Sequence, residues 1–141
     1  MAKATVTVRR ATPADGAAVL ALLRSHDGLE AEFKAGEFCL AGDGDSVLAC
    51  GRLRRHDDGA LELASVATQA GLHGRGLGST VVDCILSGVR EPVYALALAP
   101  GFFARHGFRE VAKTSLPASV LAKADGMCAS REFVAMRRDG R

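Results

Sequence analysis

A glycine-rich hexapeptide between a strand-like run and a helix-like run constrains this chain more than any other feature. Its sequence, His-Gly-Arg-Gly-Leu-Gly at residues 73–78, follows the apolar run 61–68 and precedes the amphipathic run 79–86. Glycines at alternate positions leave no Cβ in the way of a ligand, so successive backbone N–H groups can converge on an anion at a helix N-terminus. The positive end of that helix adds to the attraction. The segment therefore predicts a pyrophosphate-binding loop.

The residues beside the loop distinguish between its possible ligands. A Walker loop requires Lys followed by Ser or Thr, whereas Gly78 is followed directly by Ser79-Thr80 with no Lys nearby. A dinucleotide fingerprint requires Gly or Ala where Ser79 stands, and it also requires a carboxylate about twenty residues further on, which is missing. A nucleotide-binding module is therefore a distant alternative, and an acyl-CoA ligand is favoured.

The loop resembles motif A of the GCN5-related N-acetyltransferases, in which Gln or Arg precedes x-x-Gly-x-Gly/Ala. His73 stands where Gln or Arg is usual. Residues 99–108, Ala-Pro-Gly-Phe-Phe-Ala-Arg-His-Gly-Phe, resemble the helix followed by Gly-Phe that closes the CoA site of that family. The two segments occur in the family's order and spacing. The resemblance implies acetyl-CoA as co-substrate and transfer of its acetyl group to an amine.

Further segments look like the short acetyltransferases related to N-acetylglutamate synthase, and like those found with arsenic-resistance genes. They are Cys50-Gly-Arg-Leu, residues 61–68, residues 102–108, Leu116-Pro117 and the tail 127–136. Relatives that acetylate glutamate tend to carry Thr at the end of the fifth strand, where this chain has Leu-Ala-Leu-Ala at 96–99. We therefore expect a small amine acceptor, with an amino acid as the favoured class.

Length and composition fit one globular domain over residues 1–141. A chain of this length buries roughly two thirds of its unfolded surface. A net charge of +2 and few aromatic residues argue against nucleic acid. The sequence has no membrane-spanning run and no apolar signal-peptide stretch, so we expect a cytoplasmic protein without membrane contact. The expected partners are the amine substrate and, as a possible assembly, a homodimer.

The four cysteines do not form a recognisable metal or disulfide framework. They are scattered along the chain without a C-x-x-C pair and without His at ligand spacing. We therefore expect no metal, and free buried thiols at Cys39, Cys50, Cys84 and Cys128.

The pattern of apolar residues and turns predicts a mixed, twisted α/β sheet covered by helices. Strands are expected at residues 5–9, 37–41, 46–54, 60–68, 93–98, 108–112 and 131–136, with hairpin turns at 42–45 and 56–59. Helices are expected at residues 12–24, 29–34, 79–89, 101–106 and 116–123. The first should start at the cap Thr12-Pro-Ala-Asp15 and bury Ala17, Leu20 and Leu23, and Gly107 should end the fourth in the left-handed conformation.

The resemblance implies that CoA lies between the strands 61–68 and 93–98. The pantetheine amides would pair with strand backbone, the pyrophosphate would lie on the N–H groups of residues 74–79, and basic side chains would reach the phosphates. The implied CoA-binding residues are Val66, Thr68, His73, Gly74, Arg75, Gly76, Leu77, Gly78, Ser79, Phe103, Arg105 and His106.

Acetyl transfer requires a neutral amine, whereas a free alkyl ammonium has a pKa near 10, so a group must accept its proton. Glu62 is the predicted base, because it lies on the strand leading into the loop and has small neighbours. The alternative is that Glu62 only forms an ion pair with Arg52 or Arg54 on the adjacent strand.

The sequence also gives expectations for other positions. Many family members have a Tyr as general acid where this chain has Phe103, so Phe103 is expected to pack, and the proton would come from solvent or the amine, or from Tyr94, Cys39 or Cys128. His56 and His26 are expected to be solvated. Three basic residues could bind an acidic acceptor, namely Arg24, Lys34 and Arg52. A non-catalytic acyl-CoA sensor remains the alternative function.

Overall fold

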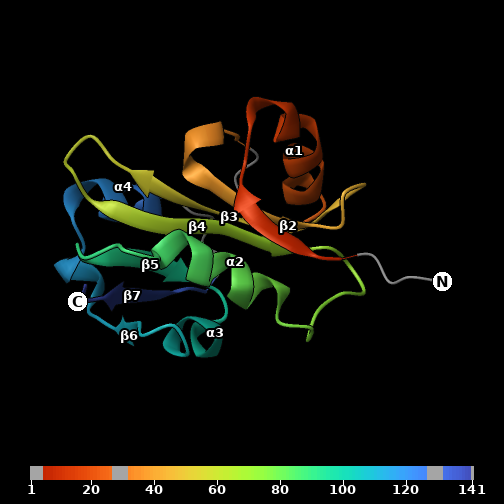
Figure 1. Cartoon of the computed structure of the whole chain (residues 1–141). Coiled ribbons are helices and arrows are strands. Elements are labelled where there is room, and N and C mark those ends of the chain that lie inside the picture. Colours follow the sequence, from red (N-terminus) through yellow and green to blue (C-terminus); the bar gives the residue numbers. More distant parts are fainter. Residues whose placement is uncertain (1–4, 27–31, 127–131, 141) are drawn as a thin grey trace. The chain divides into compact units, whose positions relative to one another are not determined.

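The computed structural model describes residues 5–26, 32–126 and 132–140. Seven described strands form a mixed sheet in the order β1-β2-β3-β4-β5-β7-β6 (Figure 1). The strands are β1 (Thr7–Arg10), β2 (Phe38–Gly42), β3 (Val47–Arg55), β4 (Leu61–Thr68), β5 (Val93–Ala97), β6 (Arg109–Glu110) and β7 (Val134–Arg138). The helices are α1 (Gly16–Arg24), α2 (Leu77–Leu86), α3 (Pro100–Ala104) and α4 (Ala118–Asp125). This confirms the predicted α/β class.

The chain forms two compact units. The first comprises Met1–Arg52 and Ser65–Ser87, and the second comprises Leu53–Ala64 and Gly88–Arg141. None of the described helices has the length and apolar character needed to cross a membrane.

In the first unit, α1 and α2 cover opposite faces of the strands. Side chains alternate along a strand, and the register pairs Leu40 with Cys50 and Cys39 with Gly51. Leu40 and Cys50 belong to one apolar cluster with α1, whose other buried members are Ala11, Val19, Leu22, Leu23, Phe38 and Ala67. The other face, with Cys39 and Gly51, is covered by α2 through Val81, Val82, Ile85 and Leu86.

The buried face of α1 differs from the prediction. Ala17 is exposed and Leu20 half-buried, whereas Val19 and Leu22 are buried with Leu23. The predicted cap is present, since the Thr12 N–H donates to Asp15 Oδ2 at 2.7 Å. However, residues 13–15 form a 3₁₀ turn before the α-helix begins. A 3₁₀-helix has three residues per turn, whereas an α-helix has 3.6. The 3₁₀ turn therefore changes the direction in which every later side chain of α1 points.

Other predicted boundaries were also wrong. Of the predicted helix 29–34, residues 29–31 lie outside the described residues, and 32–34 are not helical; a 3₁₀ turn follows at Ala35–Glu37. The helix predicted at 79–89 begins at Leu77 and ends at Leu86, so Val89 is not on it. Gly88, with a φ of 77°, takes the left-handed conformation just after the helix end.

The second unit is built around β5. Its ladder with β4 is parallel and includes Leu61 with Val93 and Glu62 with Tyr94, while β5 pairs along its length with β7. The apolar side chains of α4 pack with those of β5 and β7 in one cluster, which contains Leu116, Val120, Ala124, Ala135, Tyr94 and Leu96. The helix itself starts and ends two residues later than predicted.

The predicted turns are confirmed where the structure describes them. Asp43 Oδ1 accepts hydrogen bonds from the N–H groups of Asp45 and Ser46 in the first hairpin, and Gly59 has a φ of 88° in the second. Gly107 has a φ of 89° after α3, as its place beyond the helix predicts.

Candidate active site

The glycine loop joins β4 to the N-terminus of α2. Gly74 and Gly76 have φ values of 84° and 77°, which disfavour any residue with a side chain. A Cβ added at either position would meet no atom of the protein within 4 Å. The glycines are therefore required by the backbone conformation, and the space above them is open. Gly78 differs, because it lies in the first turn of α2.

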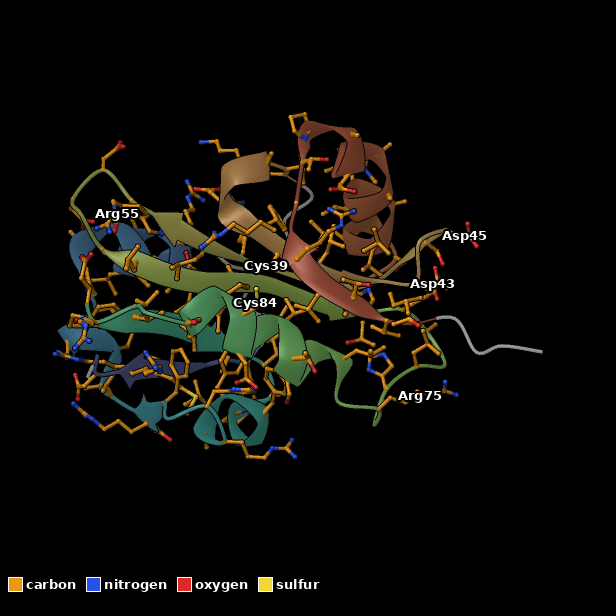
Figure 2. The ribbon with its side chains drawn as sticks, viewed as in Figure 1. Cys39, Asp43, Asp45, Arg55, Arg75 and Cys84 are labelled. Carbon is orange, nitrogen blue, oxygen red and sulfur yellow. The ribbon has the colours of Figure 1, made fainter. Side chains whose placement is uncertain are left out.

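The first turn of α2 supplies hydrogen-bond donors beside this open space. Gly76 is the N-cap of the helix, and its carbonyl accepts hydrogen bonds from both the N–H and the Oγ1 of Thr80. The N–H groups of Leu77 and Gly78, at the start of the helix, have no helical carbonyl four residues earlier to bond to, so they can point at an anion. His73 and Arg75 are exposed on the loop, and Figure 2 shows Arg75 at its tip. The arrangement suits a phosphate group.

The strand that leads into the loop bends at Ser65. Its φ of 55° makes it the one non-glycine with a positive φ among the described residues. Ser65 is buried, and its carbonyl accepts a hydrogen bond from Cys50 Sγ at 3.6 Å. Backbone held in such a sparsely populated conformation is typical of ligand-binding sites. Beyond the bend, Val66 and Thr68 are half-buried.

In the second unit, Glu62 is a buried carboxylate with a basic partner on each oxygen. His56 Nε2 lies 2.9 Å from Oε1, and Lys123 Nζ lies 2.6 Å from Oε2. The Glu62 side chain is 2% exposed, that of His56 8% and that of Lys123 26%. A carboxylate this deeply buried requires such partners, since an unpaired charge in the interior is very costly.

One expectation about this region was wrong. His56 is not solvated, because its side chain is buried against Glu62. Arg52 is buried in the first unit, where it forms ion pairs with Glu37 and Glu32 and lies over the Phe38 ring. The charged partners of Glu62 and Arg52 thus include residues from other segments of the chain, namely Lys123 and Glu37.

Lys123 and Asp58 are functional candidates that the sequence pattern did not reveal. Asp58, in the turn after β3, accepts hydrogen bonds from the Ser119 N–H at 3.0 Å and from Ser119 Oγ at 2.8 Å. These bonds hold the pKa of Asp58 below its usual value, the backbone N–H of Ser119 contributing most. The turn at 56–60 therefore contacts Glu62 through His56 and also holds the start of α4, which carries Lys123.

The other predicted residues lie in varied surroundings. Phe103 is buried and packs edge-on against Phe108 at 5.6 Å between ring centroids. Arg105 is exposed just after α3, and the His106 ring lies 5.1 Å from that of Phe102. Arg24 is exposed at the end of α1, and Lys34 is exposed just before the 3₁₀ turn at Ala35–Glu37.

The alternative proton donors lie on different elements of the chain. Tyr94 is the register partner of Glu62 in the β4–β5 ladder, and its ring lies 5.7 Å from the Arg137 guanidinium carbon. Cys39 is buried in the first unit, and Cys128 lies outside the described residues. Among the described residues, no group of three or more His, Cys, Asp or Glu side chains is placed to hold a metal ion.

Comparison with known proteins decides the family. Residues 13–108 match the model of the Acetyltransferase (GNAT) family. The chain belongs to this family. The match spans the glycine loop and the Gly-Phe segment, so both segments on which the resemblance rested lie within it.

Individual relatives are consistent with membership of the GNAT family. An amino-acid acetyltransferase of Mycobacterium tuberculosis is 34% identical over 91 residues, which cover 62% of this chain and 51% of that protein. This chain thus spans about half the length of that curated relative. The structure of Rv2747 from Mycobacterium tuberculosis, solved in complex with CoA, has 25% identity and a TM-score of 0.76 over 94% of this chain and 98% of that one.

A further structure supports the fold alone. N-acetylglutamate synthase from Neisseria gonorrhoeae, complexed with coenzyme A and L-arginine, is 20% identical with a TM-score of 0.78. The superposition covers 99% of this chain and 34% of that one. The GNAT fold predicted from the sequence is therefore confirmed.

Proposed function

We propose that this GNAT chain is an acetyl-CoA-dependent N-acetyltransferase that acts on a small amine, with an amino acid as the favoured class of acceptor. In this proposal residues 1–141 act as one acetyltransferase domain. The observation that carries it is the open, glycine-lined loop at the N-terminus of α2, where Gly74 and Gly76 leave room for a ligand. Family membership and the amino-acid acetyltransferase among its relatives support the same activity.

The residues present fit the diphosphate of CoA. Its charge would be held by the N–H groups of residues 74–79, with His73 and Arg75 free to approach from the exposed side of the loop. The backbone at Val66 and Thr68 would pair with the pantetheine amides, as an added strand pairs with a sheet edge. Phe103, Arg105 and His106 of the α3 segment are proposed as further CoA contacts.

The reaction we propose is a direct attack of the amine nitrogen on the thioester carbon. A carbon–nitrogen bond forms, the carbon–sulfur bond breaks, CoA leaves as its thiolate, and the amine proton passes to a base. We assign the base to Glu62. Its Oε2 already accepts a hydrogen bond from a primary ammonium group, that of Lys123, and the acceptor amine would replace Lys123 there. His56 would hold Oε1 in place meanwhile.

An acidic acceptor would be recognised by Arg52 and Arg24. Arg52 already binds carboxylates, and its partner Glu32 has a side chain that is 42% exposed, so the carboxylate of an acceptor could displace it. Arg52→Lys should then raise the KM for the acceptor more than that for acetyl-CoA, because Lys cannot reproduce the planar fork of Arg. Equal turnover of an amino acid and its amide would remove this assignment.

Two observations favour a second function, that of a non-catalytic acyl-CoA sensor. Both oxygens of Glu62 are engaged within the protein, and Phe103 cannot donate a proton. The two functions are separated by measuring free thiol released from acetyl-CoA in the presence of amino acids, polyamines, aminoglycosides and peptide N-termini. An acetyltransferase releases thiol with one class of amine, whereas a sensor binds CoA in calorimetry and releases none.

A further inference from the structure

Two cysteines that are 45 residues apart in the sequence bring their sulfur atoms into contact. Cys39 Sγ on β2 lies 3.4 Å from Cys84 Sγ on α2, and both are free thiols. Figure 2 shows the two side chains next to each other, where α2 runs beside β2. Both belong to the first unit. The proposed acetyl transfer uses neither thiol at this contact.

The contact follows from the close approach of α2 to the strands. Gly51 on β3 is the register partner of Cys39, and a Cβ at Gly51 would lie 3.1 Å from Ile85 Cδ1 and 3.4 Å from Val81 Cγ1. The missing side chain therefore lets the helix lie close to the sheet. Ile85 is next to Cys84 on the same helix and is buried, so tight packing fixes the height of the Cys84 sulfur above Cys39.

The two thiols differ in their access to solvent. Cys39 is 1% exposed, and burial, together with the contact to Cys84, raises the pKa of its thiol to about 11. Cys84 is half-buried. An oxidant in solution therefore reaches Cys84 first, while Cys39 stays protonated behind it.

We propose that Cys39 and Cys84 form a disulfide that joins β2 to α2 when the protein meets a peroxide. The Cys84 sulfur first attacks hydrogen peroxide, which gives Cys84 sulfenic acid and one water. The Cys39 sulfur then attacks the Cys84 sulfur, the S–S bond forms, and the sulfenic hydroxyl leaves with the Cys39 proton as a second water. In sum, two thiols are oxidised and one peroxide is reduced to two waters.

The structural adjustment required is small. A disulfide has an S–S distance of about 2.05 Å, so the sulfur atoms must approach by roughly 1.3 Å. The bond would fix α2 near its C-terminal end while its N-terminus carries the glycine loop. Closing a loop of this length restricts the unfolded chain, and we expect the thermal midpoint to rise by about 5–10 °C. This inference does not depend on the proposed acetyltransferase activity.

The test is peptide mapping of the whole protein after treatment with hydrogen peroxide. Free thiols are blocked with N-ethylmaleimide in guanidinium, and the protein is digested with trypsin and with an endoprotease that cuts before Asp. The second cut, at Asp43 and Asp45, is needed because trypsin leaves Cys39 and Cys50 on one peptide. We expect a peptide pair joined through Cys39 and Cys84, removed by dithiothreitol, with Cys50 alkylated.

Variants make the result specific. Cys84→Ser and Cys39→Ala should each abolish the joined peptides and the rise in midpoint, whereas Cys50→Ser should retain both. A parallel sample with Cys128→Ser excludes exchange with that thiol. Wild-type protein in which Cys39 and Cys84 are still alkylated after peroxide, or in which Cys84 goes directly to sulfinic acid, would overturn the proposal. So would a disulfide between Cys39 and Cys50 in place of the Cys39–Cys84 pair.

Discussion

Lys123 Nζ lies 2.6 Å from Glu62 Oε2, although the two residues are 61 positions apart. The contact depends on α4, whose first turn is held by Asp58 through Ser119. His56, two residues before Asp58, contacts the other oxygen of Glu62. The turn at 56–60 and helix α4 therefore fix the surroundings of this buried carboxylate. A change in either should alter the contacts of Glu62.

Asp58→Ala tests the attachment of α4. The change removes the acceptor for the Ser119 N–H and Oγ, so the first turn of α4 loses its cap and the protein should unfold a few degrees lower. Differential scanning calorimetry measures the effect. Asp57→Ala is the matched control, since Asp57 is the exposed neighbour in the same turn. Equal midpoints for the two variants would show that Asp58 does not hold the helix.

Glu62→Gln tests the assignment of the base. Gln keeps the shape of Glu but cannot accept the amine proton, so turnover should fall by about 10²–10⁴-fold while the affinity for CoA stays within about twofold. Steady-state thiol release and calorimetric titration provide the two measurements. Glu110→Gln, at an exposed residue of β6, serves as the control. Wild-type turnover by Glu62→Gln across neutral pH would assign the proton transfer to water or to another side chain.

Gly51→Val tests the close packing of α2 on the sheet. The new side chain would meet Ile85, Val66 and Val81 at 3.1–3.4 Å from its first atom, so overpacking should cost about 1–3 kcal/mol of stability. Urea unfolding measures this. Gly36→Val is the comparison, because a Cβ at Gly36 meets no atom within 4 Å and its φ is not left-handed. If both variants unfold at the same urea concentration, α2 is not packed as described.

The buried thiols predict a loss of stability at alkaline pH. The pKa of Cys39 is raised from 9.0 to about 11 and that of Cys50 from 9.0 to about 12, in both cases mainly by burial. Between pH 9 and these raised pKa values, the unfolded chain releases thiol protons that the folded chain retains. The contribution of the thiols to stability is therefore fully present below pH 9 and is lost as the pH rises through 11. Unfolding midpoints of Cys39→Ala/Cys50→Ala should decline less steeply over this window than those of the wild type; parallel curves would contradict the prediction.

Local features of the fold could be predicted from the sequence because the signals are themselves local. The glycine loop, the two hairpin turns and the cap at Gly107 each depend on a backbone conformation that only a few residue types adopt readily. The phase of α1 could not be predicted, because a single 3₁₀ turn after Thr12 changes which residues face the core. Gly88, just after the end of α2, is the kind of residue that predicts a helix end, but the apolar periodicity that continues to Val89 concealed it.

The surroundings of the candidate site could not be predicted, because they come from segments far apart in the sequence. Glu62 was identified from its place on the strand before the loop. Its partner Lys123, the contact of Cys39 with Cys84 and the pairing of Arg52 with Glu37 all depend on tertiary packing. No periodicity or motif near any of these residues encodes its partner.

The central claim is that the glycine loop binds the diphosphate of CoA, and calorimetric titration of CoA into Gly76→Val tests it most directly. The control is Gly44→Val in the β2–β3 turn. Gly44 has a φ of 96° and, like Gly76, an open Cβ position, so both variants carry similar backbone strain. We predict that folded Gly76→Val loses measurable CoA binding while Gly44→Val binds as the wild type does. Unchanged CoA affinity in a folded Gly76→Val protein would contradict the assignment of the loop.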